Sequence, residues 1–292
     1  MINFILKHFD LDSKYIEIHE GYSYDKKYKV FKQNQQFLLR QIDSKNRNQT
    51  RSQIDVASTC ERHALPVQKL AGVYQTDDYD YLLFHWIEGQ NLYDELPKME
   101  ESRQYTLGVK AGQIHHAIHD MPCKQTLDWV DHFNKKIDRK ITIYMNAPMH
   151  YENDEILLNA IERDRKYLSN QRISYLHGDF HALNMVLGKN KELSVIDLNR
   201  AEIGDPYEEF LRITWDVERS IPFARGRLDG YFKDEIPHEF WKLLRLYICT
   251  DLLTLLCWSA TVSSEQVQIA LDKYTLFVEY YDAFQLDVPK WY

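Results

Sequence analysis

The chain has 292 residues, of which 44% are hydrophobic, so it is long and apolar enough to bury a substantial core in one large domain or two smaller ones. The 10 glycines and 8 prolines are too few for a repetitive or disordered protein. A formal net charge of −8, without a long block of lysine and arginine, argues against a nucleic-acid partner and favours cationic partners.

The cysteines and the apolar segments indicate the cellular compartment of the protein. The four cysteines are widely spaced and form no C-x-x-C pair, which is typical of reduced thiols in a cytosolic protein. The apolar run at the N-terminus is too short for a signal peptide. The most apolar segment, 243–262, is interrupted by Arg245 and Asp251, which predicts a buried helix rather than a membrane span. We therefore expect a cytoplasmic protein with no membrane partner.

The first part of the chain predicts strands around one helix. Alternation over residues 28–32 and 37–42, on either side of a turn rich in Gln and Asn, predicts a β-hairpin. Apolar residues recur at helical spacing over 49–63, and a second hairpin is predicted over 71–87. Together these elements indicate a small α+β lobe.

The loop before the first hairpin, residues 20–25, contains a single glycine. It therefore lacks the G-x-G-x-x-G pattern that brings a backbone close to phosphates. Phosphate binding at this loop would depend on backbone N–H groups and on the hydroxyl of Ser23. An ordinary turn is the alternative interpretation.

Beyond Gly89 the pattern becomes mostly helical. Apolar residues recur at intervals of three and four over six segments: 99–120, 127–144, 152–170, 207–219, 237–261 and 264–284. This change of pattern places the domain boundary after residue 88. We expect an N-terminal lobe of residues 1–88 and a larger helical lobe of residues 89–292.

The most informative stretch covers residues 176–187 and 193–197, which predict a strand, a polar loop, a short hairpin and a strand that ends on a carboxylate. Asp179 and Asn184 are five residues apart in the loop, and Asp197 follows thirteen residues later. Phosphoryl transfer needs a carboxylate that orients and deprotonates a hydroxyl, and an amide oxygen and a second carboxylate that bind magnesium. The kinase catalytic loop, H-x-D-x-x-x-x-N followed by an Asp, has this spacing.

Residues 177–184 (HGDFHALN) and 195–200 (VIDLNR) resemble the catalytic core of the aminoglycoside phosphotransferases, which share the protein-kinase fold. The resemblance extends to 203–206 (IGDP) and 86–89 (WIEG), and more weakly to 223–232. It implies a two-lobed, protein-kinase-like α+β fold with a small β-rich N-terminal lobe and a larger, mostly helical C-terminal lobe. It also implies an O-phosphotransferase that uses ATP or GTP with Mg²⁺ and confers antibiotic resistance.

Carried over by position, the resemblance makes Asp179 the catalytic base and makes Asn184 and Asp197 the magnesium ligands. Catalysis would then consist mostly of positioning and charge neutralisation. His177 is expected to pack and hydrogen-bond within the loop, because Asp179 is better placed to exchange a proton. The alternative is that Asp179 and Asn184 cap turns and that Asp197 is a surface carboxylate.

One position departs from the family pattern. Where the resemblance implies a lysine that contacts the nucleotide phosphates, this chain has Arg40. Arginine can bond phosphate with two donors, but its planar fork differs from an ammonium group. The acidic partner on the following helix is expected at Asp55, with Glu61 as the alternative.

Two further sets of residues have both a functional and a structural interpretation. Phe84, His85 and Trp86 fall where the resemblance implies a hinge whose backbone binds the purine, and they also fit an ordinary core strand. His115 and His119 form an i, i+4 pair on a predicted helix that could bind zinc, but packing is the favoured interpretation.

The acceptor is expected to be a small, cationic molecule with a hydroxyl group, and aminoglycosides are the leading class. Five acidic residues could face it: Asp216, Glu218, Asp229, Asp234 and Glu235. Solvated helix faces explain the same residues. The rival functions are a kinase of the same fold for a macrolide, an amino alcohol or a sugar, and a nucleotide-binding pseudokinase, which the arginine at position 40 suggests. The oligomeric state stays open.

Overall fold

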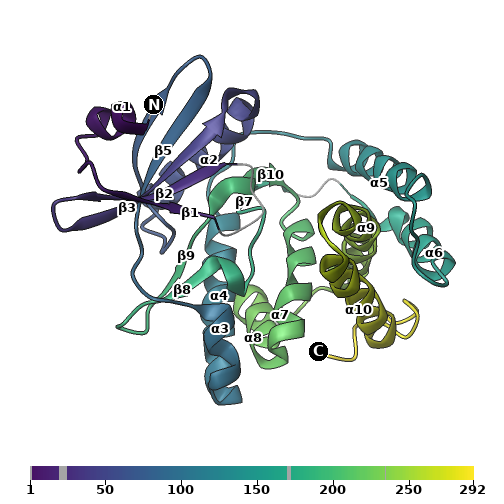
Figure 1. Ribbon diagram of the computed structural model, residues 1–292. Helices are drawn as coiled ribbons and strands as arrows, with labels where there is room; N and C mark the ends of the chain where they lie inside the picture. The colour runs from purple at the N-terminus through teal and green to yellow at the C-terminus, as the bar shows by residue number, and fades with distance from the viewer. Residues whose placement is uncertain (1, 20–24, 170–171, 234) are drawn as a thin grey trace. The chain divides into compact units, whose positions relative to one another are not determined.

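A computed structural model describes residues 2–19, 25–169, 172–233 and 235–292 (Figure 1). The chain forms two compact units, one made of Met1–Lys98 with Tyr175–Glu202 and the other of Met99–Ser174 with Ile203–Tyr292. The first segment of unit 1 therefore ends at Lys98, and the catalytic-loop segment belongs to the same unit. The expected lobes, residues 1–88 and 89–292, stay a prediction.

Unit 1 is built on a five-stranded antiparallel sheet with the order β1-β2-β3-β5-β4. Its strands are β1 (Tyr15–Ile18), β2 (Lys26–Lys32), β3 (Gln35–Asp43), β4 (Leu70–Gln75) and β5 (Tyr79–His85). Alternate residues of β2 and β3, such as Val30 and Leu39, are fully buried in a cluster with Ile5 and Leu6 of α1 (Ile2–His8). Both predicted hairpins are therefore present.

In unit 1, the long helix α2 (Arg47–Arg62) follows the short helix η1 (Ser44–Asn46). The Asp43 side chain accepts a hydrogen bond of 2.9 Å from the backbone N–H of Lys45, which satisfies a free donor at the helix start. The apolar face of α2 buries Val56 and Cys60. The polar side chains on α2 that contact the catalytic segment are described with the site.

A three-stranded sheet explains why unit 1 extends to Lys98. β6 (Gln90–Asn91) pairs with β8 (Met185–Leu187), which pairs with β9 (Leu193–Val195). The Asn91 side chain also donates 2.7 Å to the carbonyl oxygen of Leu183. The elements between and after these strands are α3 (Leu92–Glu95), η2 (Leu96–Lys98), η4 (Ala182–Asn184) and η5 (Leu198–Arg200).

Unit 2 is helical, as the sequence predicted. Its helices are α4 (Glu101–His119), α5 (Trp129–Met145), α6 (Glu155–Asp164), η3 (Arg165–Tyr167), η6 (Glu208–Arg212), α7 (Ile213–Arg219), α8 (Ile221–Phe232), α9 (His238–Val262) and α10 (Ser264–Tyr280). Two short strands, β7 (Ser174–Leu176) and β10 (Glu202–Gly204), pair with each other at the points where the chain passes between the residue ranges of the two units. α9 is apolar enough to cross a membrane by length and composition, but 67% of its most apolar window is buried, as in the core helix of a globular unit.

Glycines allow α4 and α8 to lie unusually close together. A Cβ added at Gly112 would lie 2.1 Å from the carbonyl oxygen of Arg227, and one at Gly230 would lie 2.1 Å from that of Val109. Gly108 and Gly226 make equally close backbone approaches. Any larger residue at these positions would push the two helices apart.

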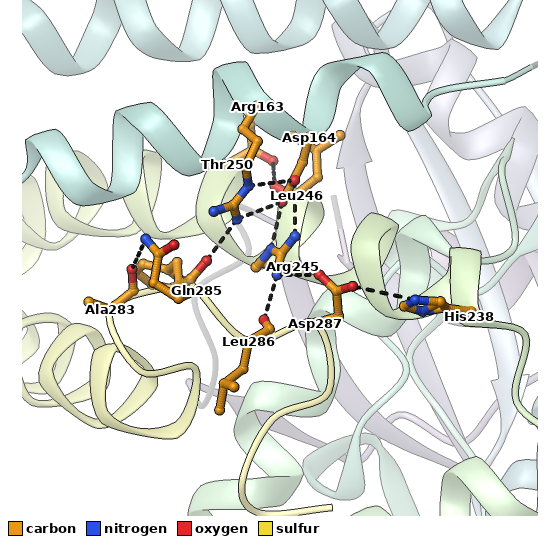
Figure 2. Close-up of polar contacts among 11 residues, drawn as sticks. Arg163, Asp164, His238, Arg245, Leu246, Thr250, Ala283, Gln285, Leu286 and Asp287 are labelled. Atoms are coloured by element: carbon orange, nitrogen blue, oxygen red, sulfur yellow. Dashed lines mark hydrogen bonds and ion pairs between the residues drawn. The ribbon is translucent and has the colours of Figure 1, made fainter.

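Arg245 of α9 anchors the C-terminal segment of unit 2 (Figure 2). Its guanidinium is almost fully buried and donates to both oxygens of Asp164, at 2.6 and 3.0 Å. The same side chain donates to Asp287 at 2.7 Å and to the carbonyl oxygen of Leu286 at 2.5 Å. A buried cation is thereby fully paired, and residues 286–287 are fixed against the core.

Candidate active site

His177 fixes the start of the catalytic loop from a fully buried position. Its Nε2 lies 2.9 Å from the carbonyl oxygen of Ile196, and the backbone N–H of Asp179 donates to its Nδ1 at 3.3 Å. These contacts fit an uncharged ring that carries its hydrogen on Nε2. His177 thus links the loop to the strand that precedes Asp197, which is the packing role predicted for it.

Gly178 makes the turn between His177 and Asp179. Its φ of +80° lies in the left-handed region, and an added Cβ would lie 1.9 Å from the carbonyl oxygen of Arg200. Both the backbone conformation and the space therefore require glycine. The turn places the Asp179 side chain in the loop with one-fifth of its surface exposed.

Asn184 holds Asp179 through its side-chain amide. Its Nδ2 donates 2.9 Å to the backbone oxygen of Asp179 and 3.2 Å to the carboxylate Oδ2. His181 Nε2 lies 3.4 Å from the other carboxylate oxygen. These bonds use the nitrogen of the Asn184 amide, so its oxygen is the atom that remains for a metal ion.

Asp197 follows β9 in a left-handed conformation, with φ 65° and ψ 68°. Such a backbone costs energy for a residue other than glycine and is frequent at functional sites. The N–H of Ile196 donates 2.9 Å to the backbone oxygen of Asn184, so the backbone beside one expected metal ligand is bonded to the other. An amide oxygen and a carboxylate are hard oxygen donors, and this pair fits Mg²⁺.

Arg40 lies on β3 and is only 1% exposed. Its Nη1 donates 2.7 Å to Asp197 Oδ1, and its Nη2 bonds the carboxylate of Asp25. The sheet therefore carries a buried cation beside the carboxylate that is expected to bind the metal. The structure thus brings together Arg40, Asp179, Asn184 and Asp197.

The expected acidic partner on α2 does not contact Arg40 in the described part of the chain. Asp55 is half-buried and accepts a bond from Thr59 through its backbone oxygen, and Glu61 lies 4.0 Å from Lys69. Sequence reasoning missed Asp25, because the family pattern directed attention to the helix. The only sequence signal for Asp25 was its position directly before the strand opposite Arg40.

The expected purine-binding segment lies at the end of β5. Phe84 is 2% exposed, and the N–H of His85 donates 2.9 Å to the carbonyl oxygen of Lys69. Phe84 and His85 are therefore held within the sheet. The N–H of Trp86 donates 3.1 Å to Gln36. Both interpretations of the segment, core strand and hinge, are therefore compatible. Ser23, which was expected to help bind phosphate, lies outside the described residues.

Unit 2 pairs most of the acidic residues that were expected to face an acceptor. Asp216 is fully buried and accepts 2.6 Å from Arg227, and Glu218 pairs with Lys273. Asp229 accepts bonds from the hydroxyls of Tyr105 and Tyr292. Glu235 is exposed, and Asp234 lies outside the described residues. Asp216 in particular is not available to a ligand.

The helix histidines of unit 2 form a buried cluster with Glu209. The Nε2 atoms of His115 and His119 lie 3.0 and 2.8 Å from the same carboxylate oxygen, Oε2. The Nδ1 atoms lie near donors, Arg227 at 3.4 Å and the Tyr231 hydroxyl at 2.9 Å. Each ring can thus accept at Nδ1 and donate from Nε2, which makes a complete hydrogen-bond network. A metal on His115 Nε2 would put a proton on Nδ1 facing the Arg227 donor, so the geometry favours packing over zinc.

Burial sets the protonation of this cluster. Burial lowers the pKa of His115 well below its ordinary range and also lowers the pKa of His119. Burial alone would raise the pKa of Glu209, but hydrogen bonds from the two histidines hold that pKa well below its ordinary value. The cluster therefore consists of one carboxylate and two neutral rings at neutral pH.

The sheet, the Asp179 loop and the buried cation beside Asp197 define a kinase-like phosphotransferase. The chain belongs to the phosphotransferase enzyme family APH, whose family model matches residues 14–243. It is accordingly a nucleotide-dependent small-molecule kinase. A sequence search among curated proteins finds no significant match.

Solved structures show the same fold at low sequence identity. A thermostable mutant of aminoglycoside phosphotransferase APH(4)-Ia, in ternary complex with ADP and hygromycin B, matches with a TM-score of 0.70 and 16% identity over 94% of this chain and 96% of that chain. The streptomycin–ATP–APH(2")-IIa complex matches at 0.65 and 17% identity, over 87% and 89%. A putative fructosamine-3-kinase from Haemophilus somnus matches at 0.62 and 13% identity, over 94% and 95%. The expected two-part α+β kinase fold is confirmed.

Proposed function

We propose that the protein transfers the γ-phosphoryl group of ATP or GTP to a hydroxyl of a small, cationic molecule, most specifically an aminoglycoside. The observation that carries the proposal is the contact between Asn184 and Asp179, next to Asp197 and its buried arginine partner. This arrangement supplies a proton acceptor, a metal-binding pair and a phosphate-binding cation in one compact unit.

Asp179 is the base in this proposal. Its carboxylate would accept a hydrogen bond from the acceptor hydroxyl, orient that oxygen toward the γ-phosphorus and take its proton as the new bond forms. The Asn184 amide restrains the carboxylate and so fixes the direction of its lone pairs. The ring of His177, bonded through both nitrogens, keeps the loop in place.

Asn184 and Asp197 would hold Mg²⁺ through the amide oxygen and the carboxylate. When bound, the ion would neutralise charge on the nucleotide phosphates. Arg40 would add a second positive charge with two donors on separate nitrogens. For the purine, the end of β5 at Phe84, His85 and Trp86 is the proposed contact.

The acceptor class rests on the relatives' ligands more than on acidic residues of this chain. The APH(4)-Ia and APH(2")-IIa structures contain hygromycin B and streptomycin, which are both cationic and hydroxylated. A similar fold occurs in a putative fructosamine-3-kinase, so a sugar amine is the nearest rival. Under this proposal the protein is a cytoplasmic enzyme that confers aminoglycoside resistance.

The test is a panel assay with the whole chain, Mg²⁺ and either ATP or GTP. Aminoglycosides, a macrolide, an amino alcohol and a fructosamine are supplied separately. Nucleoside diphosphate release and a mass gain of one phosphoryl group on the acceptor are both measured. Turnover of an aminoglycoside well above the no-acceptor rate supports the proposal, whereas turnover of the fructosamine alone assigns the rival acceptor. Nucleotide binding without turnover of any acceptor favours a pseudokinase.

A further inference from the structure

The buried guanidinium of Arg40 bonds two carboxylates with two different nitrogens. Nη1 contacts Asp197, which is 28% exposed, and Nη2 contacts Asp25, which is 12% exposed. Arg40 itself is 1% exposed, so both bonds are shielded from solvent on the arginine side. Charge-assisted hydrogen bonds of this kind are roughly twice as strong as neutral ones.

The strand register explains why Asp25 reaches Arg40. Arg40 on β3 lies directly opposite Lys27 on β2, and residues opposite one another in an antiparallel pair point to the same face. Asp25 is two residues before Lys27 and so belongs to the same face of the sheet. Lys27 and Arg40 thus share this face, and the carboxylate of Asp25 bonds Arg40 there.

Helix α2 presents neutral side chains to the catalytic segment of unit 1. Gln49 donates 2.8 Å to the carbonyl oxygen of Ala201, and Gln53 donates 3.4 Å to that of Asn199. Both side-chain amides therefore donate to the backbone that follows Asp197. Among the described residues of α2, no carboxylate bonds Arg40.

We propose that Asp25 is the positioning residue that holds Arg40 for the nucleotide phosphates, in place of an acid on α2. The inference rests on the proposed function, because it deepens the account of the same nucleotide site. Asp197 is both a partner of Arg40 and an expected metal ligand, so its carboxylate is shared once Mg²⁺ and nucleotide bind. Asp25 is not one of the expected metal ligands, so its carboxylate can keep the guanidinium in place.

Arginine and Asp25 form a matched pair. A guanidinium presents donors on two terminal nitrogens that point in different directions, so one side chain can reach both Asp25 and Asp197. A lysine has a single terminal nitrogen and a more compact charge. Replacing Arg40 with lysine should therefore weaken the simultaneous contact with Asp25 and Asp197.

The experiment measures binding of AMP-PNP with Mg²⁺ by calorimetry, using the full chain without acceptor. Asp25→Asn removes the charge and keeps the shape, Asp25→Glu restores the charge, and Asp55→Asn is the matched control on α2. The loss of a charged hydrogen bond predicts that Asp25→Asn weakens binding about tenfold or more. Asp25→Glu should recover most of that loss, and Asp55→Asn should change binding less than about twofold. A melting curve for each variant separates folding from binding.

Arg40→Lys is made in the native chain and in the Asp25→Asn variant, and AMP-PNP affinity is measured in each. A dependence of the lysine effect on Asp25 is a result that a merely structural role of Asp25 would not produce. If Asp25 acts through Arg40, lysine costs about tenfold in the native chain and much less after Asp25→Asn. Additive effects, or a binding loss in Asp55→Asn with none in Asp25→Asn, would overturn the inference. If Asp25→Asn melts far below the native protein, Arg40→Lys is tested in the Asp25→Glu chain instead. A loss of AMP-PNP affinity near tenfold there supports the pairing, and an unchanged affinity overturns it.

Failure of the inference and failure of the proposed function have different signatures. If the native chain binds AMP-PNP and Asp25→Asn binds it equally well, the pairing alone is contradicted. A native chain that binds no nucleotide contradicts both.

Discussion

Asn184 donates its side-chain amide to both the backbone and the carboxylate of Asp179, at 2.9 and 3.2 Å. One residue of the loop therefore restrains the other. The two ends of the amide have different proposed uses, since its nitrogen bonds Asp179, the proposed base, and its oxygen is the proposed metal ligand.

Asn184→Asp separates these two uses. The variant keeps an oxygen ligand but loses the N–H donors and places a second carboxylate beside Asp179. We expect kcat to fall at least tenfold while the Mg²⁺ concentration for half-maximal rate changes little. Asn184→Ala should lower kcat and also raise the Mg²⁺ requirement. Equal effects of the two variants on both quantities would show that the amide nitrogen does not position the base.

Gly178→Ala tests the backbone of the loop. A Cβ there would collide with the carbonyl oxygen of Arg200 in a left-handed conformation, so we expect a loss of stability of about 2 kcal/mol or more and a lower Tm. Gly188→Ala is the control, because its nearest neighbour is the movable side chain of Asn190. A Tm for Gly178→Ala as high as that of the control would contradict the left-handed turn and its close approach to Arg200.

Asp164→Asn tests the anchor of the C-terminal segment (Figure 2). Removing this fully buried charge leaves Arg245 without its main partner, and breaking a buried ion pair from one side costs about 3–5 kcal/mol. Asp282→Asn breaks an exposed pair with Lys290 and should cost less than about 1 kcal/mol. The free energy of unfolding from urea titration measures both, and similar small losses in the two variants would refute the anchor.

The histidine cluster of unit 2 predicts a pH dependence of stability. Burial lowers the pKa of His119 and His115 from the ordinary 6.5, so the unfolded chain binds more protons than the folded chain as the pH falls below about 6.5. This contribution to stability is complete above pH 6.5 and is lost on acidification. We therefore expect the Tm to fall more steeply with acidification in the native chain than in His119→Gln.

Comparing the two proteins removes the opposite contribution of Asp205, whose pKa burial raises to about 6. A carboxyl group with a raised pKa favours the folded state as the pH falls, and it is present in both chains. The titratable and charged groups around His119 include Glu209, Tyr231, His115, Arg227 and Arg172. Because the variant loses the bonds to Glu209 and Tyr231, it should also be less stable at pH 7.5. Identical slopes of Tm against pH in the two chains would contradict the titration of His119.

Local patterns in the sequence predicted the strands and the loop that carry the proposed site of unit 1. The strand–loop–strand pattern and the spacing of Asp179, Asn184 and Asp197 could be recognised because each depends on residues close in the chain. Both hairpins and the helix over 49–63 followed from period and turn residues in the same way.

Features that depend on residues far apart in the chain were harder to predict. The strand β6 was not predicted, because a two-residue strand has no period and forms only by pairing with β8. The partner of Arg40 is a carboxylate on an adjacent strand, and only the register of β2 and β3 reveals it. The cluster of His115, His119 and Glu209 brings together residues about ninety positions apart.

The measurement that tests the central claim most directly compares the native chain with Asp179→Asn in single-turnover phosphotransfer, with AMP-PNP binding measured in parallel. Loss of the general base should lower the rate about 10²–10⁴-fold, while Mg²⁺–AMP-PNP affinity stays within about threefold. A variant that transfers phosphoryl groups to the acceptor at nearly the native rate would contradict the account.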